Sequence, residues 1–187
     1  MIKTKKELKD CLEQDKIAMG LDNTSSFREW VKGNTDSLFL MNYIKKLRKL
    51  EYARANRASL YGKLRYFFRK KSFVAYRRRV GIFIDPDVFG PGLHIVHPGY
   101  IWVMLSSRVG KNCTILPRVL IGKKHSGIPT PCVFIGDNCY IGTGATILGP
   151  IHIGNNVTIA AGAIVVKDVP DNAVVAGNPA KIIKMKS

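Results

Sequence analysis

The chain has 187 residues, of which 46% are hydrophobic and 23% charged, and its formal net charge is +17. This size fits one domain with or without an appendage, and no apolar run reaches the roughly 18 residues of a membrane span or follows the N-terminus as in a secretory signal. The four cysteines form no C-x-x-C pair, so neither a disulfide framework nor a structural zinc site is expected. The expected location is therefore the cytoplasm.

Residues 1–80 are predicted to be helical. Thr4 with Glu7, and Ser26 with Glu29, form S/T-x-x-E patterns, which satisfy free backbone donors at a helix start. Two later stretches place apolar residues at i, i+4 and i+7, which predicts two amphipathic helices. The apolar positions are Leu40, Ile44 and Leu47 in the first, and Leu60, Leu64 and Phe67 in the second.

The excess positive charge is concentrated in residues 45–79, which carry fourteen basic residues and one acidic residue, Glu51. Aromatic side chains are interleaved with these cations, as in an interfacial helix that rests on anionic lipid, so peripheral attachment to the inner face of the membrane is one interpretation. A second is attraction of an anionic glycan or cofactor. A third is a solvated face whose aromatic residues pack on the rest of the protein. Nucleic acid is not an expected partner, because no base-reading module accompanies the charge.

From about residue 81 the sequence repeats with a period of six. An isoleucine or valine leads each unit, and the fifth residue of the later units is small or apolar. Neither a helix nor a simple strand has this period. Each hexad is expected to supply one short strand and one turn, and three hexads to close one coil that stacks on the next. The lead residues are Val103, Val109, Ile115, Ile121, Ile135, Ile141, Ile147, Ile153, Ile159 and Val165.

One segment interrupts this repeat. The step from Ile121 to Ile135 equals two hexads plus two further positions. Residues 122–134 are therefore predicted to bulge outward as a loop without loss of register. Outward loops on rigid scaffolds often carry functional residues.

The hexads, together with the segments AAGAIVVKDVP at 160–170 and AGNPAK at 176–181, resemble the hexapeptide-repeat acyltransferases. The segment GPGLHIVH at 90–97 is similar to their serine acetyltransferase branch, especially to short members associated with surface-polysaccharide biosynthesis. The resemblance implies a mainly β fold, with a left-handed parallel β-helix over residues 81–187 after the helical, basic region 1–80. It also implies a homotrimer that binds acetyl-CoA between neighbouring prisms.

Acetyl transfer from a thioester to a hydroxyl needs a general base and donors for the oxyanion, and an imidazole titrates near neutral pH. His97 aligns with the catalytic histidine of the serine acetyltransferases. His125 lies in the loop, where sugar acetyltransferases of the superfamily carry their base, so it is the second candidate. His94 is either a structural histidine or an acceptor contact, and His152 is expected to be exposed in a hexad turn.

Two departures from the serine acetyltransferase pattern concern the base and the acceptor. Phe83 stands where the family has the aspartate that pairs with the base, so Asp85, Asp87 or a backbone carbonyl is left to orient His97. Residues 130–133 replace the family's Asp-Arg-His-Pro, so this segment has no guanidinium that could hold the carboxylate of serine.

A sugar hydroxyl needs no such counter-charge, so the sequence favours a saccharide acceptor, from a surface polysaccharide or its precursor. The expected acceptor contacts are Asp85, His94 and Cys132. The expected reaction is direct O-acetylation by acetyl-CoA without an acyl-enzyme. Serine O-acetylation in cysteine biosynthesis is the alternative enzyme activity. A non-catalytic trimeric scaffold on a membrane surface is the alternative outside the enzymes.

Motif positions in the family also indicate how acetyl-CoA would bind. Thr143, Ala161 and Lys167 would line the pantetheine arm, and Lys181 or Lys184 would meet the nucleotide phosphates. No metal is expected, because the γ-class carbonic anhydrases of the same fold use an H-x4-H pair. No two of the four histidines here have that spacing.

Overall fold

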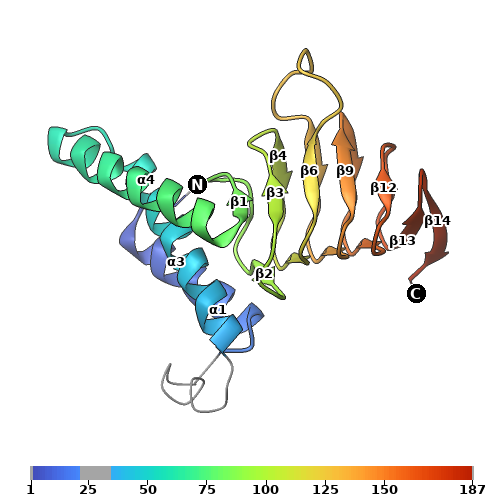
Figure 1. Cartoon of the computed structure of the whole chain (residues 1–187), viewed down its shortest axis with the longest axis horizontal. Helices are drawn as coiled ribbons and strands as arrows, with labels where there is room; N and C mark the ends of the chain where they lie inside the picture. The colour runs from blue at the N-terminus through green and yellow to red at the C-terminus, as the bar shows by residue number, and fades with distance from the viewer. Residues whose placement is uncertain (1, 22–34, 187) are drawn as a thin grey trace.

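The computed structural model describes residues 2–21 and 35–186. Figure 1 shows a group of helices at one end of the molecule and a row of stacked strands that extends away from them to the C-terminus. The described helices are α1 (Lys5–Ala18), α3 (Thr35–Ala55) and α4 (Leu60–Val80). The helical and β parts share one continuous cluster of buried apolar residues, so they do not form separate cores.

Local signals explain where these helices begin and end. Thr4 and Glu7 form a capping box at the start of α1, as the sequence predicts, whereas the similar Ser26–Glu29 pattern lies outside the described residues. Ser59 caps α4, and Gly81 ends it in the left-handed region at φ 74°. Helix α3 buries the apolar face expected for it.

The orientation of α4 differs from the sequence-based expectation. Its predicted apolar face points to solvent, because Leu60, Leu64 and Phe67 are 84%, 53% and 50% exposed. The helix instead buries Phe73, whose ring centroid lies 5.5 Å from that of Tyr43 on α3. The i, i+4, i+7 spacing correctly predicted a helix, but aromatic residues on the opposite side supply its packed face.

The strands form three sheets, and successive strands of the chain pass from one sheet to the next. The first sheet contains β1 (Ile82–Ile84), β3 (Ile101–Val103), β6 (Leu120–Lys123), β9 (Thr146–Gly149) and β12 (Ile164–Val165). The second contains β4 (Ser107–Val109), β7 (Val133–Ile135) and β10 (Ile151–Ile153). The third contains β2 (His94–Ile95), β5 (Thr114–Ile115), β8 (Tyr140–Ile141), β11 (Thr158–Ile159), β13 (Ala173–Gly177) and β14 (Ala180–Met185). All neighbours are parallel except β13 and β14.

The register confirms a coil of three hexads. Ile141 pairs with Ile159, and Ile147 pairs with Val165, so each partner lies three hexads further along the chain. All ten lead residues are buried, and so are the fifth-position residues of the later units, including Cys139. The stack therefore encloses columns of apolar side chains, and its turns form the edges of a three-sided prism.

The predicted outward loop is present, but its geometry differs in one respect. Ile121 pairs with Ile147, which lies four hexads and two positions further on, so this coil exceeds a regular one by one hexad and two positions. The whole excess falls in the single step from β6 to β7, in agreement with the long step from Ile121 to Ile135 in the sequence. The loop proper is residues 124–132, because β6 continues to Lys123 and β7 begins at Val133. In Figure 1 it projects beyond the ends of the strands.

Candidate active site

His97 lies exposed in the turn between β2 and β3, at the edge where the third sheet meets the first. The turn lies close against the next coil. A Cβ added at Gly99, whose φ is 155°, would come within 2.8 Å of Pro117. Glycine at position 99 therefore allows the His97 turn to rest on that coil.

The residues expected to line the pantetheine arm fall partly on this same edge. Thr143 lies between β8 and β9, and Ala161 lies between β11 and β12, so both occupy turns from the third sheet to the first. The amide of Gly144 donates to Pro117 O (3.0 Å), and the amide of Gly162 donates to Thr143 O (2.8 Å). The structure thus places His97, Thr143 and Ala161 along one line, which we call the His97 edge.

His125 and Lys167 belong to a different edge. Loop 124–132 joins the first sheet to the second, and Lys167 lies in the corresponding turn after β12, before the bridge of Val169 with Ile153 in the second sheet. Lys124 Nζ links the two segments by donating to Val166 O (3.1 Å). We call this line the loop edge. Lys181 and Lys184 lie exposed on β14, at the end of the third sheet.

His94 lies half-buried near His97, with its Nδ1 3.4 Å from Thr114 Oγ1. Burial lowers the pKa of His94, and the positive charge of a protonated His97 lowers it further. At neutral pH, His94 is therefore an uncharged hydrogen-bonding group beside the candidate base.

This pKa shift predicts a pH dependence of stability. Because the folded state lowers the pKa of His94 from its ordinary value of 6.5, the unfolded chain binds the proton more readily. The free energy of unfolding should therefore fall as the pH drops through and below about 6.5. Urea unfolding at about pH 7, 6 and 5 should show this decline, and His94→Gln should reduce its slope. His152→Gln, at an exposed imidazole, is the control, and equal slopes in wild type and His94→Gln would contradict the assignment.

The two aspartates considered as partners of His97 are engaged elsewhere. Asp85 Oδ1 lies 3.2 Å from Arg77 Nη1, and Asp85 Oδ2 accepts from the Leu105 amide (2.9 Å). Asp87 Oδ2 lies 3.4 Å from Arg54. Both carboxylates thus hold helices against the prism, and Asp85 is not assigned to the acceptor.

The structure also refines the predictions made for Cys132 and His152. Cys132 is only 5% exposed, and its amide donates to Ser106 O (2.8 Å), so it anchors the end of the loop instead of presenting a thiol to an acceptor. His152 is exposed as expected, but it lies in strand β10 and stacks on Phe134 with ring centroids 4.7 Å apart. An outward strand position exposes a side chain as fully as a turn does.

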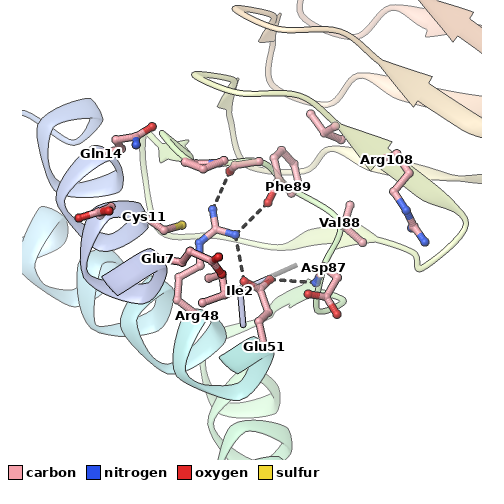
Figure 2. A pocket seen from close by; sticks show the side chains of 14 residues that line it. Ile2, Glu7, Cys11, Gln14, Arg48, Glu51, Asp87, Val88, Phe89 and Arg108 are labelled. Atoms are coloured by element: carbon pink, nitrogen blue, oxygen red, sulfur yellow. Dashed lines mark hydrogen bonds and ion pairs between the residues drawn. The ribbon is translucent and has the colours of Figure 1, made fainter. Parts of the chain in front are cut away.

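A cavity of about 410 Å³ lies between α1 and the first coil (Figure 2), and Asp87 alone among the predicted site residues lines it. A buried ionic cluster, formed by Asp15, Arg48 and Glu51, lies beside it. Arg48 Nε lies 2.8 Å from Asp15 Oδ2, and Arg48 Nη1 lies 3.1 Å from Glu51 Oε2. Burial disfavours the Arg48 cation, but the carboxylates of Glu51 and Asp15 outweigh burial and raise its pKa.

This cluster holds the segment that leads into β2. Arg48 donates to Phe89 O (2.8 Å) and Gly90 O (2.7 Å), and Asp15 Oδ1 accepts from the amides of Gly92 and Leu93 (2.9 Å each). The sequence analysis did not predict this ionic cluster, although the sequence contains one indication of it. Arg48 and Glu51 follow Ile44 at i+4 and i+7, so they fall on the apolar face of α3.

Among residues 2–21 and 35–186, no helix is long and apolar enough to cross a membrane. Over the same residues, no group of three or more His, Cys, Asp or Glu side chains could hold a metal ion.

Comparison with known proteins extends these observations. The family described as bacterial transferase hexapeptide (six repeats) matches residues 132–167. Serine acetyltransferase 2 of Arabidopsis thaliana is 39% identical over 108 residues, which are 56% of this chain and 33% of that protein. The chain thus spans about a third of the length of this curated relative.

Solved structures resemble the chain over almost its whole length. A serine acetyltransferase of Brucella abortus in complex with coenzyme A is 30% identical and covers 98% of this chain and 70% of its own, with a TM-score of 0.67. A serine acetyltransferase of Neisseria gonorrhoeae in complex with serine is 28% identical and covers 96% and 70%, with a TM-score of 0.66.

These likenesses overturn the expectation of a saccharide acceptor. The compared proteins are serine acetyltransferases, which fits the alternative enzyme activity better than a polysaccharide O-acetyltransferase. The expectation rested on one missing guanidinium at residues 130–133. The absence of one arginine does not exclude an acceptor with a carboxylate, because a cation elsewhere can neutralise that charge. Lys123 and Lys124, for example, lie where the loop begins.

The comparisons also bear on the winding of the prism. The hexapeptide family and the serine acetyltransferase structures imply a left-handed β-helix, in agreement with the resemblance of the sequence. The match over 98% of the chain includes the helices as well as the prism. The chain therefore belongs to the hexapeptide-repeat acyltransferases, in their serine acetyltransferase-like branch.

Proposed function

We propose that this chain is an acetyl-CoA-dependent serine O-acetyltransferase. The observation that carries the proposal is the likeness, over nearly the whole chain, to serine acetyltransferases whose structures hold coenzyme A or serine. The His97 edge supports it, because the candidate base and two candidate cofactor contacts lie on one line of turns.

In the proposed reaction, His97 accepts the proton of the serine hydroxyl as its oxygen attacks the thioester carbonyl. Backbone N–H groups near the site stabilise the resulting oxyanion. The intermediate then collapses, the carbon–sulfur bond breaks, and the leaving thiolate takes the proton back from the His97 imidazolium. The products are O-acetylserine and free coenzyme A, and no acyl-enzyme is formed.

We further propose that the chain acts as a homotrimer. His97, Thr143 and Ala161 lie on one edge of the prism, whereas His125 and Lys167 lie on another. A groove between two copies can bring the His97 edge of one copy to the loop edge of the next. In that arrangement Lys167 contributes to the cofactor site from the neighbouring copy, and His125 contacts the acceptor. Lys181 and Lys184 stay assigned to the nucleotide phosphates.

The cytoplasm remains the proposed location. All four cysteines are free and buried, as expected where thiols stay reduced.

The acceptor is tested by thiol release from acetyl-CoA. We expect release with L-serine and little release with ethanolamine, which has the same hydroxyl and amino groups but no carboxylate. A buried or partly buried counter-charge discriminates strongly against an acceptor that leaves it unpaired. Saturable turnover with L-serine would support the proposal, and equal turnover of the two compounds or none with L-serine would refute it.

A further inference from the structure

The exposed face of α4 has no partner within the described chain. Five large apolar side chains are exposed in its N-terminal half, and they recur at the spacing of one helix face. They are Leu60, Tyr61, Leu64, Phe67 and Phe68. A stripe of this kind on a globular protein usually marks an interaction surface.

The rest of α4 is strongly cationic. The helix carries eight basic residues and no acidic one, and six of these cations are exposed. Lys71 Nζ lies 5.6 Å from the Phe67 ring centroid, and Lys70 Nζ lies 6.0 Å from that of Tyr66. The exposed cations that accompany the stripe are Lys63, Arg69, Lys70, Lys71, Arg78 and Arg79.

This combination limits what can cover the stripe. The side of α4 that faces α3 is already occupied, because Phe73 packs on Tyr43 and Tyr76 stacks on the same ring at 6.5 Å. A second copy of the stripe would bring two like-charged helices together, which electrostatic repulsion opposes. A suitable partner is therefore both negatively charged and able to take up apolar side chains.

We propose that the outward face of α4 binds the surface of an anionic lipid bilayer. The aromatic and leucine side chains enter the boundary between headgroups and acyl chains, and the flanking lysines and arginines extend to the headgroup phosphates. Membrane contact thus becomes a second property of the chain, independent of the proposed acetyl transfer.

The position of α4 is compatible with this role. Figure 1 shows α4 at the outer side of the helical part, with the prism extending away from it toward the C-terminus. The C-terminal end of α4 leads into β1, so the N-terminal half that carries the stripe lies away from the prism (Figure 1).

The test is flotation of the purified protein with vesicles of equal parts phosphatidylglycerol and phosphatidylcholine, and with vesicles of phosphatidylcholine alone, at about 0.1 M salt. We expect binding to the anionic vesicles only. K63Q/K70Q/K71Q should weaken it about fivefold for each residue, or about a hundredfold in total. F67S/F68S should also weaken it, by removing the inserted rings.

K5Q/K6Q/K9Q is the matched control, since it removes the same charge from exposed positions of α1. It should leave binding unchanged, because distant charges are screened at this ionic strength. Circular dichroism checks that each variant is folded. Acetyl transfer should be unchanged in all three variants, which separates this proposal from the proposed function.

Several results would overturn the proposal. They include no flotation of the wild type, equal flotation with both vesicles, or an equal loss in the α1 control. Full binding by F67S/F68S would show that the stripe does not enter the bilayer. Binding of heparin or duplex DNA without binding of vesicles would identify a polyanion as the partner. Self-association that depends on Phe67 and Phe68 would identify a second copy.

Discussion

Replacing His97 by alanine is expected to lower kcat for acetyl transfer by about 10²–10⁴-fold, which is the usual contribution of a general base. The KM for acetyl-CoA should change little, because the proposed contacts of the donor lie elsewhere, on Thr143 and Ala161. Steady-state thiol release with L-serine measures both quantities, and circular dichroism verifies folding.

His125→Ala is the matched control for this prediction. His125 is also an exposed imidazole, but it lies on the loop edge. If it contacts the acceptor, its loss should raise the KM for serine and leave most of kcat. A hundredfold loss of kcat in His125→Ala, with near-normal kcat in His97→Ala, would exchange the two roles.

Replacing Arg48 by methionine is expected to destabilise the fold by about 3–5 kcal/mol. The substitution keeps a long apolar stem but leaves Asp15 and Glu51 as uncompensated buried carboxylates, and it removes the donors to Phe89 O and Gly90 O. Urea unfolding at neutral pH measures the loss.

Lys49→Met is the control, because Lys49 lies next in the same helix and is exposed. It should change the free energy of unfolding by less than about 0.5 kcal/mol. A similarly small effect of Arg48→Met would mean that water or relaxation of the cavity compensates the two carboxylates.

The prism was predictable from the sequence because its repeat is a direct consequence of its geometry. Ile141, Ile147 and Ile153 each fill the interior of one face, so an apolar residue returns at every sixth position whatever the turns contain. Thr143 and Ala161 are three hexads apart, so their shared edge also follows from the coil length. The left-handed winding of the prism does not follow from this period, and only the family resemblance implied it.

The helical part was less predictable, because helix periodicity shows a stripe but not what covers it. Leu60, Leu64 and Phe67 have the spacing of a packed face, yet the packing of α4 is decided by Phe73 against Tyr43. Arg48 lies within an apolar face, and only the tertiary structure reveals the carbonyls and carboxylates that satisfy it.

The acceptor shows a further limit of sequence reasoning. A substrate is recognised by the whole surface that several segments form together, and electrostatic attraction acts over distance. One absent side chain at residues 130–133 therefore says little about total binding. Asp85 illustrates the same point, because its place shortly after Phe83 did not disclose its pairing with Arg77.

The extra length between β6 and β7 has an evolutionary implication. Since Ile121 still pairs with Ile147 across it, the segment can lengthen, shorten or be exchanged while the columns on either side keep their phase. In terms of the proposed function, such changes would remodel the loop edge around His125 and leave the His97 edge of the same copy unchanged. Exchanging this segment between relatives would test whether it influences the choice of acceptor.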